Sequence, residues 1–280
     1  MTRSPLCCRQ GPQVPLSFCA DREICPQLCA EVEIGNTWEA PETAPKRRTV
    51  AHRRLWQGMK LILSRKGFDS SAGGKPSPIF PDGTMISLPI PDKASPICYR
   101  DIAGNQHASV GELVHDLAPQ VLPTYRAHLD PDLSFQSIPR ADGWRPLFGQ
   151  EGDAESHLEN QGVGPGDVFL FFGLFREVER SVDGWRYVRG SRPMHVIFGW
   201  LQAAKRVAVS NWPTDAPWAI YHPHFQREPH PKNVVYVGAE RLQLPGLQSS
   251  AIPGAGLFAA FAPKLQLTEP QCGQIGRAHV

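Results

Sequence analysis

The chain has 280 residues, of which 41% are hydrophobic, so it can bury one sizeable core. Its 25 Gly and 28 Pro residues favour loops and short strands over long helices. No apolar run approaches the roughly 18 residues of a membrane span, and no secretory signal opens the chain, so we expect a cytoplasmic protein without membrane contact.

The charge balance argues against a protein that binds duplex DNA over a broad basic face. Residues 1–58 carry 8 Lys and Arg and 6 Asp and Glu, and removing these from the totals of 29 and 27 leaves 21 of each sign. Proteins that bind duplex DNA mainly through its phosphates usually show a basic excess. We therefore expect any contact with a nucleotide or with DNA to be local.

The two ends differ from the body of the chain. Residues 1–58 hold five of the seven cysteines and show no sustained period of 2 or 3.6 before the pattern changes at Met59. We expect this part to be a disordered extension or the product of a start assigned too far upstream. The last six residues, "IGRAHV" at 275–280, resemble translated adapter sequence, so we expect a non-native tail and a domain over 59–274.

The first half of the body predicts short strands and one helix. Residues 59–64 form an apolar run that we expect to be a central strand, and residues 84–90 alternate as a second strand. A helix is predicted over 109–119, because Ser109 can act as its N-cap and Glu112 completes a capping box.

The second half carries the strongest strand signals. A long polar loop and a short helix over 152–162 precede "GPGDVFLFFG", where a turn leads into an apolar strand, and Asp183-Gly184 predicts a hairpin turn. Further strands are predicted over residues 194–202, 217–225 and 233–238. The sequence therefore predicts an α+β fold, a strand-rich single domain with a few short helices.

A Gly-rich loop follows the strand at 59–64, in "SRKGFDSSAGGKPSP". A phosphate-binding P-loop leads into a helix and offers backbone N–H groups to phosphate. Pro76 and Pro78 have no N–H and oppose a helix, which excludes that mechanism.

The same loop offers other ligand contacts. Arg65 can hold a phosphate or carboxylate through two hydrogen bonds, and Lys66 adds a point charge. Asp69 can accept from a sugar hydroxyl or a base N–H, while Gly73 and Gly74 let a flat ligand approach the backbone. The alternative is a glycine turn with solvated charges.

Histidines and carboxylates supply candidate catalytic groups. The segment "HLDPDL" places His128, Asp130 and Asp132 within five residues, a set that suits acid–base chemistry or metal binding. The alternative is an Asx-type turn, since Asp-Pro pairs favour turns. His157 lies in the helix pattern at 152–162, where a lone histidine is more often structural.

Two further patterns bear on metal binding. In "YHPHF", His222 and His224 would point the same way on a strand, as half of a metal site. Because the sequence identifies no partner ligands for them, a structural or ligand-stacking role is preferred. Cys25 and Cys29 also lack a second pair or a nearby His. No metal site is predicted, and the sequence identifies no cofactor.

Four stretches together resemble a known family over about residues 59–240. They are the segment from Met59 to Pro91, "HLDPDL", "HLENQGVGPGDVFLFFGLFR" and "HVIFGWLQ", and they resemble the nucleotide modification associated domain 3 family. Its members are regarded as DNA base hypermodification proteins of bacteria and phages. The resemblance implies a nucleotide or modified base as the ligand, and it adds Ser70, Arg176 and His195 to the ligand-contact residues.

A second resemblance is to base-binding domains of the PUA-like kind, carried by "VGPGDVFLFFG" and "MHVIFGWLQ". It implies a partly open β-barrel core. The leading hypothesis is a DNA base modification protein in which Asp69 or Asp130 is the general base and His128 or His157 the acid. The alternatives are a PUA-like module that reads a modified base without chemistry, and a structural partner of other DNA-modification proteins.

Overall fold

The structure is a computed structural model that describes residues 58–246 and 251–268. The extension predicted over 1–58, apart from Gly58, and the tail predicted over 275–280 lie outside the described residues. Among the described residues, no helix has both the length and the apolar character that crossing a membrane requires.

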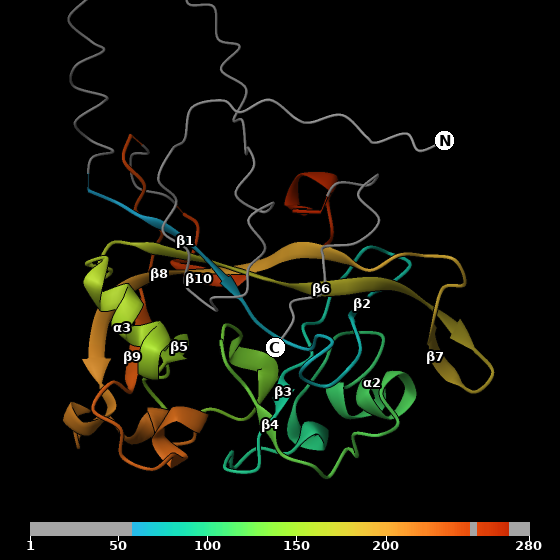
Figure 1. Ribbon diagram of the computed structural model, residues 1–280, viewed down its shortest axis with the longest axis horizontal. Helices are drawn as coiled ribbons and strands as arrows, with labels where there is room; N and C mark the ends of the chain where they lie inside the picture. The colour runs from blue at the N-terminus through green and yellow to red at the C-terminus, as the bar shows by residue number, and fades with distance from the viewer. Residues whose placement is uncertain (1–57, 247–250, 269–280) are drawn as a thin grey trace, which may run out of the picture.

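One mixed sheet of eight strands organises the fold (Figure 1). Its strands are β1 (Leu61–Arg65), β2 (Ser77–Ile79), β5 (Leu147–Gln150), β6 (Val168–Ser181), β7 (Gly184–Tyr187), β8 (Met194–Ala208), β9 (Val234–Gly238) and β10 (Ala255–Leu257). The main path runs β1-β6-β8-β9-β5, with β2 and β7 also pairing with β6 and β10 with β8. The described end strands β1 and β5 do not pair, so the sheet is not closed into a barrel.

The long strands β6 and β8 form because aromatic and β-branched residues follow one another there. They pair antiparallel, and β1 runs parallel to β6 on its other side. Alternation along β6 sends Phe169 and Phe171 to the inner face, where their ring centroids lie 4.8 and 5.0 Å from that of Phe148 on β5. This inner face is the main hydrophobic core.

Two helices and a small second sheet lie on the inner side of the large sheet (Figure 1). The helices are α2 (Val110–Leu117) and α3 (Gly152–Asn160), and the second sheet pairs β3 (Ile90–Pro91) with β4 (Ala127–His128). In Figure 1, α3 lies beside β5 and β9, whereas α2 lies toward β7. The β3–β4 sheet sits between the helices, so β4 delivers His128 to the middle of the inner side.

The α+β prediction is confirmed, and so are the elements with strong local signals. The helix over 109–119 has Ser109 as its N-cap with a complete capping box, and Asp183 precedes Gly184 in the β6–β7 hairpin. The strand predicted over 59–64 is present as β1, but it lies at an end of the sheet rather than at its centre.

Two predicted strands are wrong. Residues 84–90 contribute an isolated bridge at Met85 and the first residue of β3 instead of a continuous strand. Residues 217–225 form 3₁₀ turns with a proline at the start of each, at Pro217 and Pro223. Proline lacks the N–H that a strand ladder needs, and its fixed φ suits the first turn of a helix.

Replacing Ser109 by Ala tests the predicted cap. The Ser109 hydroxyl accepts from the Glu112 N–H at 3.2 Å, while the Glu112 carboxylate accepts from the Ser109 N–H at 2.7 Å. We expect Ser109→Ala to lower the free energy of unfolding by about 1 kcal/mol in urea titrations. Ser210→Ala, at an exposed serine outside any cap, is the control. An unchanged midpoint for Ser109→Ala would show that the box adds no stability.

Candidate functional site

The segment "HLDPDL" passes through the centre of the inner side, where most of its polar side chains are buried. His128 ends β4, Asp130 follows it, and Asp132 exchanges two backbone hydrogen bonds with Leu147 of β5. The Asp132 carboxylate is held by a two-pronged ion pair, in which Arg140 Nη1 and Nη2 each donate over 2.7 Å. Asp132 is thus committed to Arg140, while Asp130 lies among groups from other segments.

The carboxylate of Asp130 is fully buried and surrounded by donors. Its Oδ1 accepts from the Gly149 N–H at 2.7 Å, and its Oδ2 lies 3.2 Å from Lys66 Nζ. Burial alone would raise the pKa of this carboxyl, but the charge of Lys66 and the His222 ring hold the pKa well below its ordinary value. Asp130 is therefore an ionised carboxylate in the interior.

His128 lies between two carboxylates, with Nδ1 at Asp92 and Nε2 facing Asp130. Its Nδ1 lies 2.7 Å from Oδ2 of Asp92. The hydrogen bond from His128 is the main reason that the pKa of Asp92 lies well below its ordinary value. Asp92 is therefore ionised and can only accept, so Nδ1 of His128 donates to it. In the neutral ring the lone pair is then on Nε2, which lies 3.8 Å from Oδ2 of Asp130.

His224 is arranged in the same way by a different partner. Its Nδ1 lies 2.7 Å from Oδ1 of Asn233, and the amide nitrogen of Asn233 donates to the His224 carbonyl at 2.8 Å. The second bond fixes the amide orientation, so Nδ1 donates and Nε2 carries the lone pair. Burial is the main cause that lowers the pKa of His224 to about 4, which keeps the ring neutral at pH 7.

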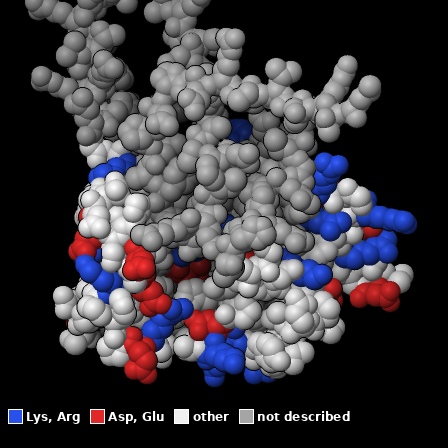
Figure 2. Space-filling view, in the orientation of Figure 1, with Lys and Arg blue, Asp and Glu red and all other residues white. Residues whose placement is uncertain are grey.

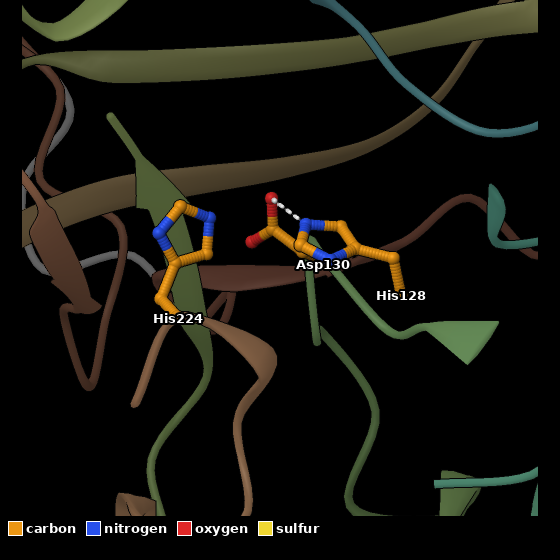
Figure 3. A group of neighbouring side chains, drawn as sticks. All are labelled: His128, Asp130 and His224. Atoms are coloured by element: carbon orange, nitrogen blue, oxygen red, sulfur yellow. Dashed lines mark ion pairs between the residues drawn. The ribbon is translucent and has the colours of Figure 1, made fainter. Parts of the chain in front are cut away.

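The three groups converge on one point. Ligand atoms of His128, Asp130 and His224 all lie within 4.8 Å of one another. Figure 3 shows the Asp130 carboxylate between the two imidazole rings, each with its Nε2 side turned toward it. We call this group, together with the adjacent Lys66 and His222, the Asp130 cluster. It combines a carboxylate, an ammonium group and three imidazoles in the protein interior.

His222 completes the cluster without a hydrogen bond of its own. The ring is fully buried, and its Nε2 lies 3.4 Å from Oδ1 of Asp130, within ion-pair distance but without hydrogen-bond geometry. Within the described part of the chain, neither ring nitrogen of His222 has a hydrogen-bond partner. A buried polar group in this state costs about 1–3 kcal/mol, which is unusual outside functional sites.

The Arg65–Lys66 pair is divided between the two faces of the sheet. Along β1, Ile62 and Ser64 are buried and Arg65 is exposed, so the next side chain, Lys66, turns inward to Asp130. Its ammonium also lies 4.6 Å from the centre of the Phe148 ring. Arg65 instead pairs with Asp69. The two cations therefore serve different sites.

The Gly-rich loop after β1 is organised by its own aspartate. Asp69 Oδ1 accepts from the Ser71 N–H and hydroxyl, both at 2.7 Å, and from the Ala72 N–H at 2.8 Å. Gly73 packs against the Phe68 ring so closely that a Cβ would lie 2.4 Å from it. Gly74 has a positive φ, and Ser70 is exposed. The structure does not bring Asp69 together with Asp130, and the ligand role of this loop stays a prediction.

Three other predicted site residues also lie apart from the Asp130 cluster. His157 is on α3, with an Nε2 that has no hydrogen-bond partner among the described residues. Arg176 donates to Ser191 at 3.1 Å. His195 lies on the outer face of β8, the side of the sheet to which Arg65 also turns. Their proposed roles stay predictions as well.

Sequence reasoning missed two residues and set two others aside. Asp92 and Asn233 orient the histidine rings, yet no local motif marks either of them. The "HPH" pattern did single out His222 and His224, and the structure places "HLDPDL" residues beside them. These segments are nearly a hundred residues apart, so only the fold reveals the match.

A cavity of about 210 Å³ reaches the cluster at Asp130. Its wall is mostly apolar, with contributions from Met85, Leu129, Leu133, Phe198, Leu257 and Phe258. A larger hollow of about 520 Å³ lies between α2 and the β6–β7 hairpin, but none of the residues of the Asp130 cluster lines it. The smaller cavity adjoins Asp130 and has the mostly apolar wall that is usual for a binding site, so it is the candidate.

Replacing Gly149 by Ala tests the packing around His224. A Cβ at this position would lie 2.2 Å from Cδ2 of His224, whose ring is anchored by Asn233. We expect Gly149→Ala to lower the free energy of unfolding by about 1–3 kcal/mol, measured in urea. Gly164→Ala, where no atom lies within 4 Å of the new Cβ, is the matched control. Equal stability of the two variants would contradict this packing.

The position of His195 on the outer face of the sheet predicts that stability depends on pH. Burial is the main cause that lowers the pKa of His195 to about 4, and the nearby Arg65 charge adds to the effect. In the unfolded chain the pKa of this histidine is about 6.5. As the pH falls from 6.5 to 4, His195 binds a proton in the unfolded chain but not in the folded protein, so the free energy of unfolding falls. We expect His195→Gln to reduce this decrease in the free energy of unfolding by on the order of 2 kcal/mol, measured by urea unfolding at several pH values. His230→Gln, at an exposed histidine, is the control. If the free energy of unfolding varies with pH in the same way in the wild type and in His195→Gln, His195 is not the group responsible.

Comparisons with known proteins identify a family. The model of nucleotide modification associated domain 3 matches residues 60–279, a span that contains every residue of the Asp130 cluster. No curated protein and no solved structure gives a significant match. The family match covers most of the chain and agrees with the resemblance seen in the sequence. The chain therefore belongs to the nucleotide modification associated domain 3 family.

Proposed function

We propose that this protein chemically modifies a DNA base or a nucleotide, with the Asp130 cluster as the reacting centre. One observation carries the proposal: an ionised carboxylate without solvent exposure is surrounded by Lys66 and three histidines, and the residue that bears it, Asp130, adjoins a cavity. Family membership supplies the association with nucleotide modification. The cytoplasmic location and the bacterial or phage source stay predictions.

The cost of the cluster favours chemistry over recognition alone. Burying a carboxylate and an ammonium group costs several kcal/mol per ion before their attraction is counted. A module that only reads a base needs stacking surfaces and hydrogen bonds to the base edges. Buried groups with strongly shifted pKa values are instead typical of reacting centres.

The division of roles follows from the charges. In the neutral rings, Nε2 of His128 and Nε2 of His224 can accept a proton or bond to an electrophile, and the Asp130 carboxylate can stabilise the positive charge that results. Lys66 can stabilise negative charge that develops on the reacting base or its modifying group. Four of the five members of the cluster, all except His222, then have a use during a reaction.

The size of the cavity suits a base rather than a whole nucleotide. Its 210 Å³ is below the roughly 300–1,000 Å³ of ordinary ligand pockets. A base within a duplex would have to leave the stack to enter it, as it does in other base-modifying enzymes. Figure 2 shows Lys and Arg side chains mixed with Asp and Glu side chains around the lower and left edges, and Lys and Arg gathered at the right edge, which suits contacts to DNA over part of the surface only.

Mass spectrometry of the products tests the proposal. Purified protein is incubated with canonical DNA, with modified DNA and with deoxynucleoside monophosphates, each in the presence of a small-molecule cell extract as the source of a group donor, and the digested nucleosides are analysed. We expect a new nucleoside mass with the wild type and a loss of about 100-fold or more with Asp130→Asn. Asp153→Asn, at an exposed site on α3, is the control, and thermal unfolding confirms that each variant is folded. Unchanged substrates that nevertheless bind would establish the alternative, a reader module.

A further inference from the structure

We propose that His128, Asp130 and His224 bind a divalent first-row transition-metal ion. Because Asp92 and Asn233 occupy the Nδ1 atoms, the ligand atoms would be Nε2 of each histidine and one carboxylate oxygen of Asp130. Two imidazoles and one carboxylate are a donor set that zinc and non-haem iron(II) sites use. The inference goes beyond the proposed function, because binding of an ion requires neither substrate nor turnover.

The spacing of the donors is close to that of a formed site. Metal bonds of about 2.0–2.2 Å place neighbouring donors roughly 3–3.5 Å apart. His128 Nε2 already lies 3.8 Å from Oδ2 of Asp130, and all three ligand atoms lie within 4.8 Å of one another. Side-chain movements of about 1 Å would therefore close the site around an ion.

The hydrogen bonds behind the donors are those that metal ligands need. Asp92 accepts from Nδ1 of His128, and Asn233 accepts from Nδ1 of His224. Each bond puts the proton on the outer nitrogen and aims the Nε2 lone pair at the common point (Figure 3). The Gly149 N–H orients the third donor through Oδ1 of Asp130, which leaves Oδ2 facing the rings.

His222 is a second, independent observation that points to a ligand. Its ring is fully buried at ion-pair distance from Asp130, and within the described chain both of its nitrogens lack hydrogen-bond partners. A bound ion next to Asp130 would give this ring an acceptor for its lone pair. His222 lies beside Oδ1 of Asp130, outside the group of three converging ligands, and is an unpartnered buried ring next to the proposed site.

Lys66 is the resident positive charge with which an ion would compete. Its ammonium lies 3.2 Å from Oδ2 of Asp130, and its side chain is 16% exposed. The flexible stem allows the ammonium to withdraw toward solvent when an ion enters. Lys66 interacts with one carboxylate oxygen and leaves the histidine lone pairs unused, so it does not account for the cluster by itself. Removal of this charge is expected to tighten ion binding.

The experiment measures ion binding by the full chain in the absence of nucleotide. Protein stripped with EDTA is titrated with Co²⁺ and with Zn²⁺ by calorimetry, and visible absorption follows the Co²⁺. We expect one ion per chain in a site of nitrogen and oxygen donors, with affinity reduced at least 10-fold in His128→Gln and in His224→Gln. Lys66→Met is expected to bind at least as tightly as the wild type. His230→Gln, at an exposed histidine, is the matched control.

X-ray absorption of the cobalt-loaded wild type keeps the test independent of variant folding. Imidazole scattering at about 2.0–2.1 Å supports the site, whereas sulfur at about 2.3 Å would assign the ion to cysteines and overturn the proposal. Absence of stoichiometric binding to both the wild type and Lys66→Met would also overturn it, as would undiminished affinity in both folded histidine variants. An ion that binds without base chemistry contradicts the proposed function alone, and base chemistry without an ion contradicts this inference alone.

Discussion

The burial of the Asp130 carboxylate constrains the centre of this molecule. A buried carboxylate needs hydrogen-bond donors and a positive charge around it, because a buried charge that is left unpaired destabilises the fold by about 3–5 kcal/mol. Gly149 supplies an N–H, Lys66 supplies the charge, and His222 lies at ion-pair distance. These residues come from three segments of the chain. Their packing must be correct together before Asp130 can be ionised inside the protein.

The large sheet provides that packing. Its inner face carries the aromatic core of Phe148, Phe169 and Phe171, and the same face receives Lys66 from the end of β1. The small β3–β4 sheet then holds His128 beside Asp92. An apolar scaffold with a few converging polar groups lowers the local dielectric and strengthens each interaction within the cluster.

Elements with local causes could be predicted from the sequence. The α2 helix begins at Ser109 because that residue and Glu112 satisfy each other's backbone groups, and the β6–β7 hairpin turns at Asp183-Gly184. The sequence also singled out His128, Asp130 and Lys66 as candidates, because their residue types and spacing suit chemistry. The strand predicted over 217–225 was wrong, since its prolines direct short 3₁₀ turns despite the apolar pattern.

The sequence by itself determined the family, the strand-rich class and the residues that offer chemistry, because motif, composition and period are properties of neighbouring positions. Only the tertiary structure decided which of these residues meet. It joined His128 and Asp130 to His224, which the sequence left without partners, and it sent Arg65 and Lys66 to opposite faces of the sheet. The physical reason is that strand alternation and long-range pairing set the direction of each side chain, and both depend on contacts between segments far apart in the chain.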